Sequence, residues 1–146
     1  MAGHAWLTGT VRTWSEGLRS EVPDRLEHIV SRIAHAFGAT ARFTFEPGNA
    51  GLANDPTCAE VARQAVIDTL GEQGIADYRG TLSGEDFSEY LRIVPGVFCF
   101  VGTRNPQVGA DHPQHSCHYT VDEDVLAKGS MVAAQWACRM LSGAKG

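Results

Sequence analysis

The sequence predicts an α/β protein in which short strands alternate with amphipathic helices. Two observations support this class. Segments with alternating apolar and polar residues recur between helical patterns, and a stretch rich in Pro, Gly and Asn separates two groups of such segments. The chain has 146 residues, of which 43% are apolar and 20% are charged, as in globular proteins. We therefore expect packed helices and strands rather than disorder.

The first 47 residues predict a strand, a helix and a second strand. Residues 6–14 and 39–46 alternate apolar and polar side chains, as half-buried strands do. Between them Ser20 can cap a helix that ends at Gly38. Its apolar residues recur at spacings of three and four and form one stripe: Val22, Leu26, Ile29, Val30, Ile33 and Phe37. The helix would cover one face of the sheet and leave Arg12 on the open face, where taken alone it is interpreted as a solvated strand residue.

The rest of the chain predicts three helices and two strands. A candidate domain boundary at residues 47–56 comes first, because this linker contains two Pro, two Gly and two Asn. The elements that follow are a helix over 57–70 with Asp55 near its start, a strand over 78–82, a helix capped by Ser83, a strand over 97–101, a loop over 103–118 and a helix over 122–141.

Charge and cysteine usage exclude several classes of partner and location. A formal net charge of −5 argues against a nucleic-acid or anionic-membrane surface, since both are bound through clustered Lys and Arg. No apolar run approaches the roughly 20 residues that span a bilayer, and the N-terminus lacks a signal-peptide pattern. The four cysteines form no Cys-x-x-Cys pair. We expect reduced thiols in a cytoplasmic protein, with a disulfide as the less favoured alternative.

Three histidines are the most conspicuous chemical groups. His112, His115 and His118 form a His-x-x-His-x-x-His pattern, but Pro113 places it in a loop. Taken alone, the pattern is interpreted as ordinary loop histidines, and a metal site made only of these three is the less favoured alternative. The sequence contains no Gly-x-Ser-x-Gly elbow, phosphate-binding loop or dinucleotide fingerprint.

A succession of short motifs resembles a known family over about residues 7–137. In chain order the motifs are Gly9-Thr10-Val11-Arg12-Thr13, Asn54-Asp55-Pro56, Gly84-Glu85-Asp86-Phe87, Pro95-Gly96-Val97-Phe98, Val101-Gly102, His115-Ser116, and Asp122-Glu123-Asp124-Val125-Leu126 with Gly129. Their order is similar to that of the metal-dependent aminoacylase family, which includes hippurate hydrolases, indole-acetyl-amino-acid hydrolases and carboxypeptidase-G-like enzymes.

The resemblance implies a domain organisation and three site residues. Residues 1–47 would be the second half of a ferredoxin-like lid, and residues 48–146 the terminal part of an α/β zinc-hydrolase catalytic domain. His115 matches the last metal ligand of the family, Arg12 a lid arginine that faces the substrate carboxylate, and Gly84 a loop near the substrate. The sequence departs from the family pattern beside the ligand, at Cys117 and His118.

The implied activity is hydrolysis of the amide bond of N-acyl amino acids or small peptides with a pair of zinc or other divalent ions. The resemblance implies that the remaining ligands, the catalytic glutamate and the first half of the lid belong before this chain begins, since the few residues ahead of Trp6 could not supply them. Because a catalytic zinc takes about three protein ligands, we expect a fragment that is inactive alone and does not hold zinc stably. The alternatives are a half-enzyme completed by a partner chain, and a non-enzymatic binding module that self-associates, for example as a homodimer, through unpaired strand edges.

Overall fold

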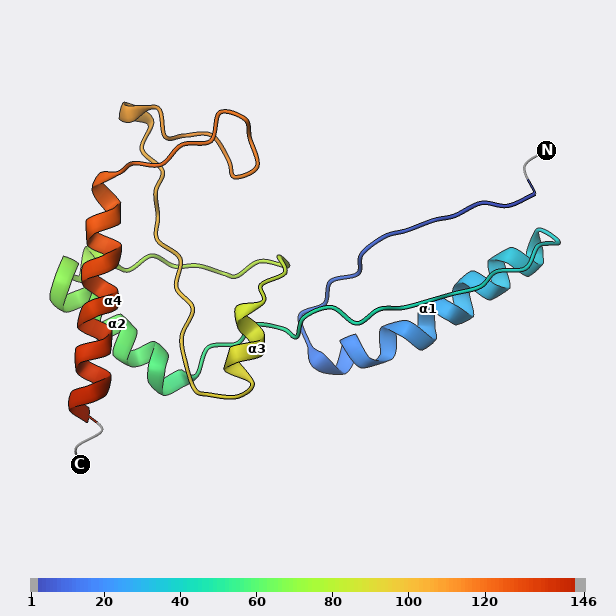
Figure 1. The fold of residues 1–146 in the computed structure, drawn as a ribbon, viewed down its shortest axis with the longest axis horizontal. Coiled ribbons are helices and arrows are strands. Elements are labelled where there is room, and N and C mark those ends of the chain that lie inside the picture. The colour runs from blue at the N-terminus through green and yellow to red at the C-terminus, as the bar shows by residue number, and fades with distance from the viewer. Residues whose placement is uncertain (1–2, 144–146) are drawn as a thin grey trace. The chain divides into compact units, whose positions relative to one another are not determined.

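The computed structural model describes residues 3–143, and these residues form helices joined by extended segments (Figure 1). The elements are α1 (Glu16–Ala36), α2 (Pro56–Leu70), η1 (Glu72–Gly74), α3 (Phe87–Leu91), η2 (Pro106–Val108) and α4 (Asp124–Gly143). The chain divides into two compact units. The α1 unit comprises Met1–Ala53 with Gly80–Arg92, and the α2–α4 unit comprises Asn54–Arg79 with Ile93–Gly146.

Helix α1 begins earlier than the sequence predicted. Its cap is Ser15, whose extended backbone directs the side-chain oxygen to accept a hydrogen bond from the Leu18 N–H at 3.2 Å, and Glu16 complements the helix dipole in the first turn. The predicted cap, Ser20, lies inside the helix instead and donates to the Gly17 carbonyl at 2.8 Å. The helix ends as predicted, because Gly38 adopts a φ of +69°, which only glycine reaches without steric cost.

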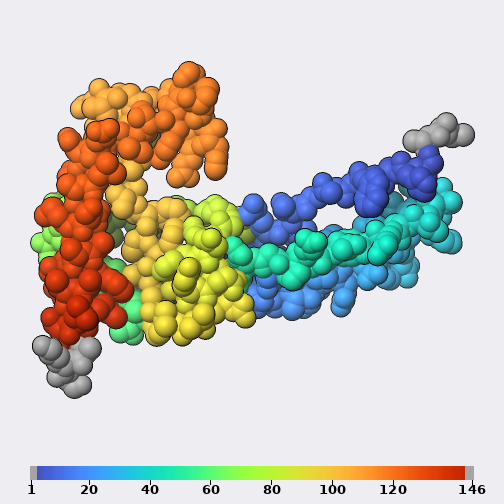
Figure 2. Space-filling view, viewed as in Figure 1, coloured from blue at the N-terminus to red at the C-terminus, as the bar shows by residue number. Residues whose placement is uncertain are grey.

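The structure corrects the prediction of paired strands. Within residues 3–143 the backbone forms no β-ladder, and the pairing between Asn105 and Ala110 is an isolated bridge. Residues 6–14 and 39–46 run as extended chain beside α1 (Figures 1 and 2). An alternating pattern specifies the two faces of an extended segment but not its hydrogen-bonding neighbour.

The apolar stripe of α1 is consequently only partly covered. Leu26 and Val30 are half-buried, but Ile29, Ile33 and Phe37 are 50%, 56% and 86% exposed. We expected a sheet to cover these three side chains. Because the extended segments form no ladder, they leave much of the apolar stripe exposed.

The two long helices of the α2–α4 unit contact each other and cross in Figure 1. Asp55 caps α2 as predicted, with Oδ1 accepting from the Cys58 N–H at 2.8 Å. The side chains that α2 buries are small, namely Cys58, Ala62 and Ala65, and small residues let two helix backbones approach closely. Trp136 of α4 donates its indole N–H to the Cys58 carbonyl at 3.2 Å.

Polar side chains at the far end of α2 also join it to α4. Asp68 accepts from the Arg139 guanidinium, with the Nε contact at 2.8 Å, and from Gln135 at 3.2 Å. These donors hold the pKa of Asp68 below its ordinary value, the arginine hydrogen bonds being the larger cause.

Two further helix boundaries differ from the prediction. Helix α3 begins at Phe87 rather than beside Ser83, because Ser83 makes no capping contact and the first turn is closed by Glu85. Helix α4 begins at Asp124, two residues later than predicted. Within residues 3–143, no helix is both long and apolar enough to cross a membrane.

The predicted strand over 97–101 is replaced by contacts with side chains. Asn54 brackets Phe98, donating to its carbonyl at 2.9 Å and accepting from its N–H at 2.8 Å. The ring of Phe100 lies 4.8 Å from that of Tyr78. The segments over 78–82 and 97–101 therefore form no ladder of their own in the described chain.

Candidate functional site

The histidine loop, residues 103–122, is closed at its base by backbone and side-chain hydrogen bonds. Asn105 and Ala110 exchange backbone bonds of 2.7 and 3.0 Å around η2, and Ala110 is 2% exposed. At the two ends of the loop the Asp122 N–H donates to the Thr103 carbonyl at 3.1 Å, and the Asn105 side-chain amide donates to Asp122 Oδ2 at 2.8 Å. The loop therefore projects its histidines from a fixed base.

Asp122 links the loop to helix α4. Its second oxygen accepts from the Asp124 N–H at 3.1 Å at the start of the helix. The Asn105 amide, then the Asp124 N–H, hold the pKa of the Asp122 carboxyl below its ordinary value, against a smaller opposing effect of burial. These hydrogen bonds therefore favour the ionised form of the Asp122 carboxyl group. The sequence placed Asp122 at the start of the last helix and in one of the motifs but did not predict this partner, although the Asn105-Pro106 dipeptide marks the turn that supplies it.

His115 has an unusual backbone. Its φ is +67°, and no other non-glycine residue in the described chain has a positive φ. Histidine enters this left-handed region more often than most residues, but it remains uncommon and frequently marks functional loops. The neighbouring turns are closed by the Ser116 N–H donating to Pro113 and the Tyr119 N–H donating to Ser116, at 3.2 and 3.1 Å. The imidazole is exposed.

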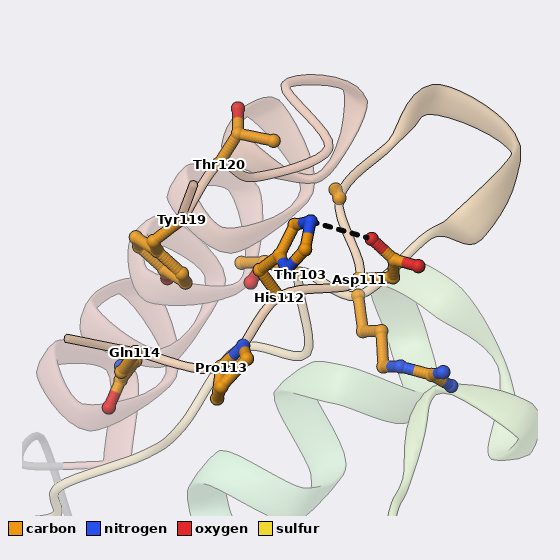
Figure 3. A pocket seen from close by; sticks show the side chains of 9 residues that line it. Thr103, Asp111, His112, Pro113, Gln114, Tyr119 and Thr120 are labelled. Atoms are coloured by element: carbon orange, nitrogen blue, oxygen red, sulfur yellow. Dashed lines mark ion pairs between the residues drawn. The ribbon is translucent and has the colours of Figure 1, made fainter. Parts of the chain in front are cut away.

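The loop also encloses a cavity of about 360 Å³ (Figure 3). Nine residues line it: Thr103, Arg104, Ala110, Asp111, His112, Pro113, Gln114, Tyr119 and Thr120. On its wall His112 Nε2 lies 3.8 Å from Asp111 Oδ1, too far for a hydrogen bond. The rings of His112 and His118 have centroids 5.3 Å apart. Of the three loop histidines, these are the two that the structure brings together.

The predicted substrate residues of the α1 unit are neighbours. Arg12 Nη1 lies 3.2 Å from the position that a Cβ would occupy on Gly84. Both residues are exposed. Within the same unit, Glu89 of α3 accepts a hydrogen bond from the Ala50 N–H at 3.0 Å, which joins α3 to the segment before α2. That hydrogen bond, with a smaller contribution from Arg92, lowers the pKa of Glu89.

A metal centre is not assembled in the described residues. Across residues 3–143, no three His, Cys, Asp or Glu side chains lie together in a way that could hold an ion. The cysteines Cys58, Cys99, Cys117 and Cys138 are free thiols. Burial, with Asp55 as the next cause, raises the pKa of the Cys58 thiol, and this is the opposite of what a thiolate ligand needs.

Residues 6–139 match the model of peptidase family M20/M25/M40, and the chain belongs to that family. The resemblance inferred from the order of the motifs is therefore confirmed. Membership is consistent with an α/β hydrolase fold.

Three relatives illustrate the match. The chain is 35% identical to thermostable carboxypeptidase 1 of Saccharolobus solfataricus over 92% of this chain and 34% of that protein. It is 33% identical to IAA-amino acid hydrolase ILR1-like 6 of Arabidopsis thaliana, over 93% of this chain and 30% of that one. It is 31% identical to N-acetyl-L-cysteine deacetylase of Bacillus subtilis, over 92% and 31%. The chain spans about a third of the length of these relatives.

Proposed function

We propose that this chain is one portion of a hydrolase that cleaves the amide bond of N-acyl amino acids or small peptides, and that it is inactive without the remainder. Residues 1–47 would belong to the second half of the lid and residues 48–146 to the end of the catalytic domain. The observation that carries the proposal is His115. It is the residue that matches a family ligand, and it holds a left-handed backbone on an anchored loop.

The donor set of this chain does not fit a catalytic metal centre by itself. The family generally uses divalent metals such as zinc, and a catalytic zinc takes about three protein ligands. His115 supplies one imidazole, and the described residues group no further pair of donors around it. No catalytic step is therefore assigned to the isolated chain, and the missing donors would come from another polypeptide segment.

The names of the three relatives share one chemical feature. A carboxypeptidase, an amino-acid conjugate hydrolase and an acetylcysteine deacetylase all release an amino acid with a free carboxylate. Arg12 suits that group, because guanidinium donors bind a carboxylate in a bidentate fork. Gly84 leaves the space in which the guanidinium lies. We therefore propose that Arg12 binds the substrate carboxylate and that Gly84, which has no side chain, leaves space for the guanidinium.

A chimera tests the metal role of His115. The matched segment of thermostable carboxypeptidase 1 would be exchanged for this chain, and zinc content and hydrolysis of an acylated amino acid would be measured. His115→Ala should lower both. Gln114→Ala on the same loop is the matched control and should leave the zinc content unchanged. Full metal retention by the His115→Ala chimera would remove this residue from the ligand set.

The same chimera tests Arg12. Arg12→Ala should weaken binding of a carboxylate-bearing inhibitor by about 1.5–3 kcal/mol, the usual contribution of a hydrogen bond to a charged group. Arg12→Lys should recover only part of that loss, because an ammonium cannot form the fork. Equal inhibitor affinity for all three proteins would refute the assignment.

Exposed apolar residues favour a second candidate function, that of a self-associating module. Trp6, Leu7 and Phe37 are 95%, 92% and 86% exposed, and contiguous exposed apolar surface usually marks an interface. Light scattering over a concentration series separates the candidates. A dimer that forms without any partner supports this module, whereas a monomer at high concentration contradicts it.

A further inference from the structure

Two imidazoles of the histidine loop, those of His112 and His118, lie close together, and His115 is not part of this pair. His112 and His118 are six residues apart in sequence, yet their ring centroids lie 5.3 Å apart, and both side chains are exposed. We propose that His112 and His118 form a binding site for a borderline divalent cation of the zinc type, separate from the ligand position of His115.

The ring separation suits one metal ion between the two imidazoles. Metal–nitrogen bonds of about 2.0–2.1 Å at the tetrahedral angle place the two centroids about 5 Å apart. Adjacent corners of a square plane would bring them to about 4.5 Å. The observed 5.3 Å is close to the first of these values, so the spacing accommodates one ion shared by the two rings.

Asp111 adds negative charge at the same place. Its Oδ1 lies 3.8 Å from His112 Nε2, and no direct hydrogen bond commits either atom to the other. A carboxylate beside a ligating histidine attracts the cation and orients the ring, even when it does not itself bind the metal. The side chains of Asp111 and His112 are 44% and 49% exposed, so an ion can reach them from solvent.

The loop positions the two rings before any ion binds. The Asn105–Ala110 pairing fixes the chain just before His112, and the His118 N–H donates to Ser116 Oγ at 3.1 Å. Preorganised ligands lose less conformational entropy on binding than ligands on a free chain.

The site is an open one. Because the described residues contain no group of three donors, the two imidazoles would share the ion with water. We therefore expect reversible binding that a chelator removes at once, unlike the retained ions of a catalytic centre.

Titration of the whole chain with Zn²⁺, followed by calorimetry and by the NMR signals of the imidazole rings, tests the proposal. Zinc should shift the ring signals of His112 and His118 and leave those of His115 in place. His112→Ala and His118→Ala should each lower affinity by roughly tenfold or more, since each removes half of the protein ligands. Asp111→Asn should weaken binding without abolishing it. Mg²⁺, which prefers oxygen ligands, should shift no ring signal.

His115→Ala is the decisive control, and circular dichroism should show that every variant keeps its helices. Unchanged zinc affinity in His115→Ala supports the separate site, whatever role His115 has in a complete enzyme. Three results would overturn the proposal: loss of binding in His115→Ala, loss in Cys117→Ser with retention in His112→Ala, or a wild-type chain whose ring signals do not respond to zinc.

Discussion

Asp122 shows how one carboxylate fixes the base of the histidine loop. It accepts from the Asn105 side chain and from the Asp124 N–H, so it joins the loop to the first turn of α4. Both donors favour the ionised form and lower the pKa of this group. The stabilisation is therefore fully present above its ordinary pKa of 3.8 and is lost as the pH falls through the lower folded value.

Asp122→Asn should accordingly reduce the free energy of unfolding at pH 6, and the difference from the wild-type chain should shrink as the pH falls below about 4. Urea denaturation at a series of pH values measures this difference. Glu123→Gln, an exposed neighbour, is the control and should show no such narrowing. A difference that stays constant from pH 6 to pH 3 would contradict the assignment.

Gly80 and Gly84 of the α1 unit should respond differently to the same substitution. Gly80 has a φ of +81°, and Trp14 lies 3.3 Å from its would-be Cβ, so Gly80→Ala should cost about 1–2 kcal/mol of stability. Gly84→Ala meets only the flexible end of Arg12 and should change stability by less than about 0.5 kcal/mol. Thermal denaturation of both variants checks the contrast, and equal losses would refute it.

At the scale of elements, the interface between α2 and α4 depends on small side chains. Ala65 is fully buried at 0% exposure, whereas Arg63 on the same helix is exposed. Ala65→Leu should therefore destabilise the chain by about 1–3 kcal/mol through overpacking, while Arg63→Leu should stay within about 0.5 kcal/mol. Urea titrations followed by circular dichroism measure both. An Ala65→Leu variant as stable as Arg63→Leu would show that the helices are not closely packed.

Helices were more predictable than strands because their signals are local. Asp55 capping α2 and Gly38 ending α1 follow from single residues, and both were predicted. A strand depends on a neighbour that its own residues do not encode, so residues 6–14 and 39–46 could be predicted as extended but not as paired. The proximity of Arg12 to Gly84 joins residues distant in the chain, and that of His112 to His118 depends on how the loop between them turns. Single-sequence spacing could nominate these residues but not place them.

At the scale of the whole molecule, the α1 unit exposes large apolar side chains to solvent. Leu7 and Phe37 are 92% and 86% exposed. Replacing both with Ser should reduce binding of a hydrophobic dye by the isolated chain, with little change in helix content. Replacing the exposed Arg25 and Glu21 ion pair with Gln is the control and should leave dye binding unchanged. Equal dye binding by all three proteins would show that this surface is already covered.

The dependence of catalysis on further donors is tested most directly by the purified chain itself. With zinc in excess, its rate of hydrolysis of an N-acyl amino acid should equal that of buffer with zinc alone, because the described residues bring together no three donors that could hold a catalytic ion. Turnover above that background, abolished by His115→Ala, would contradict the account.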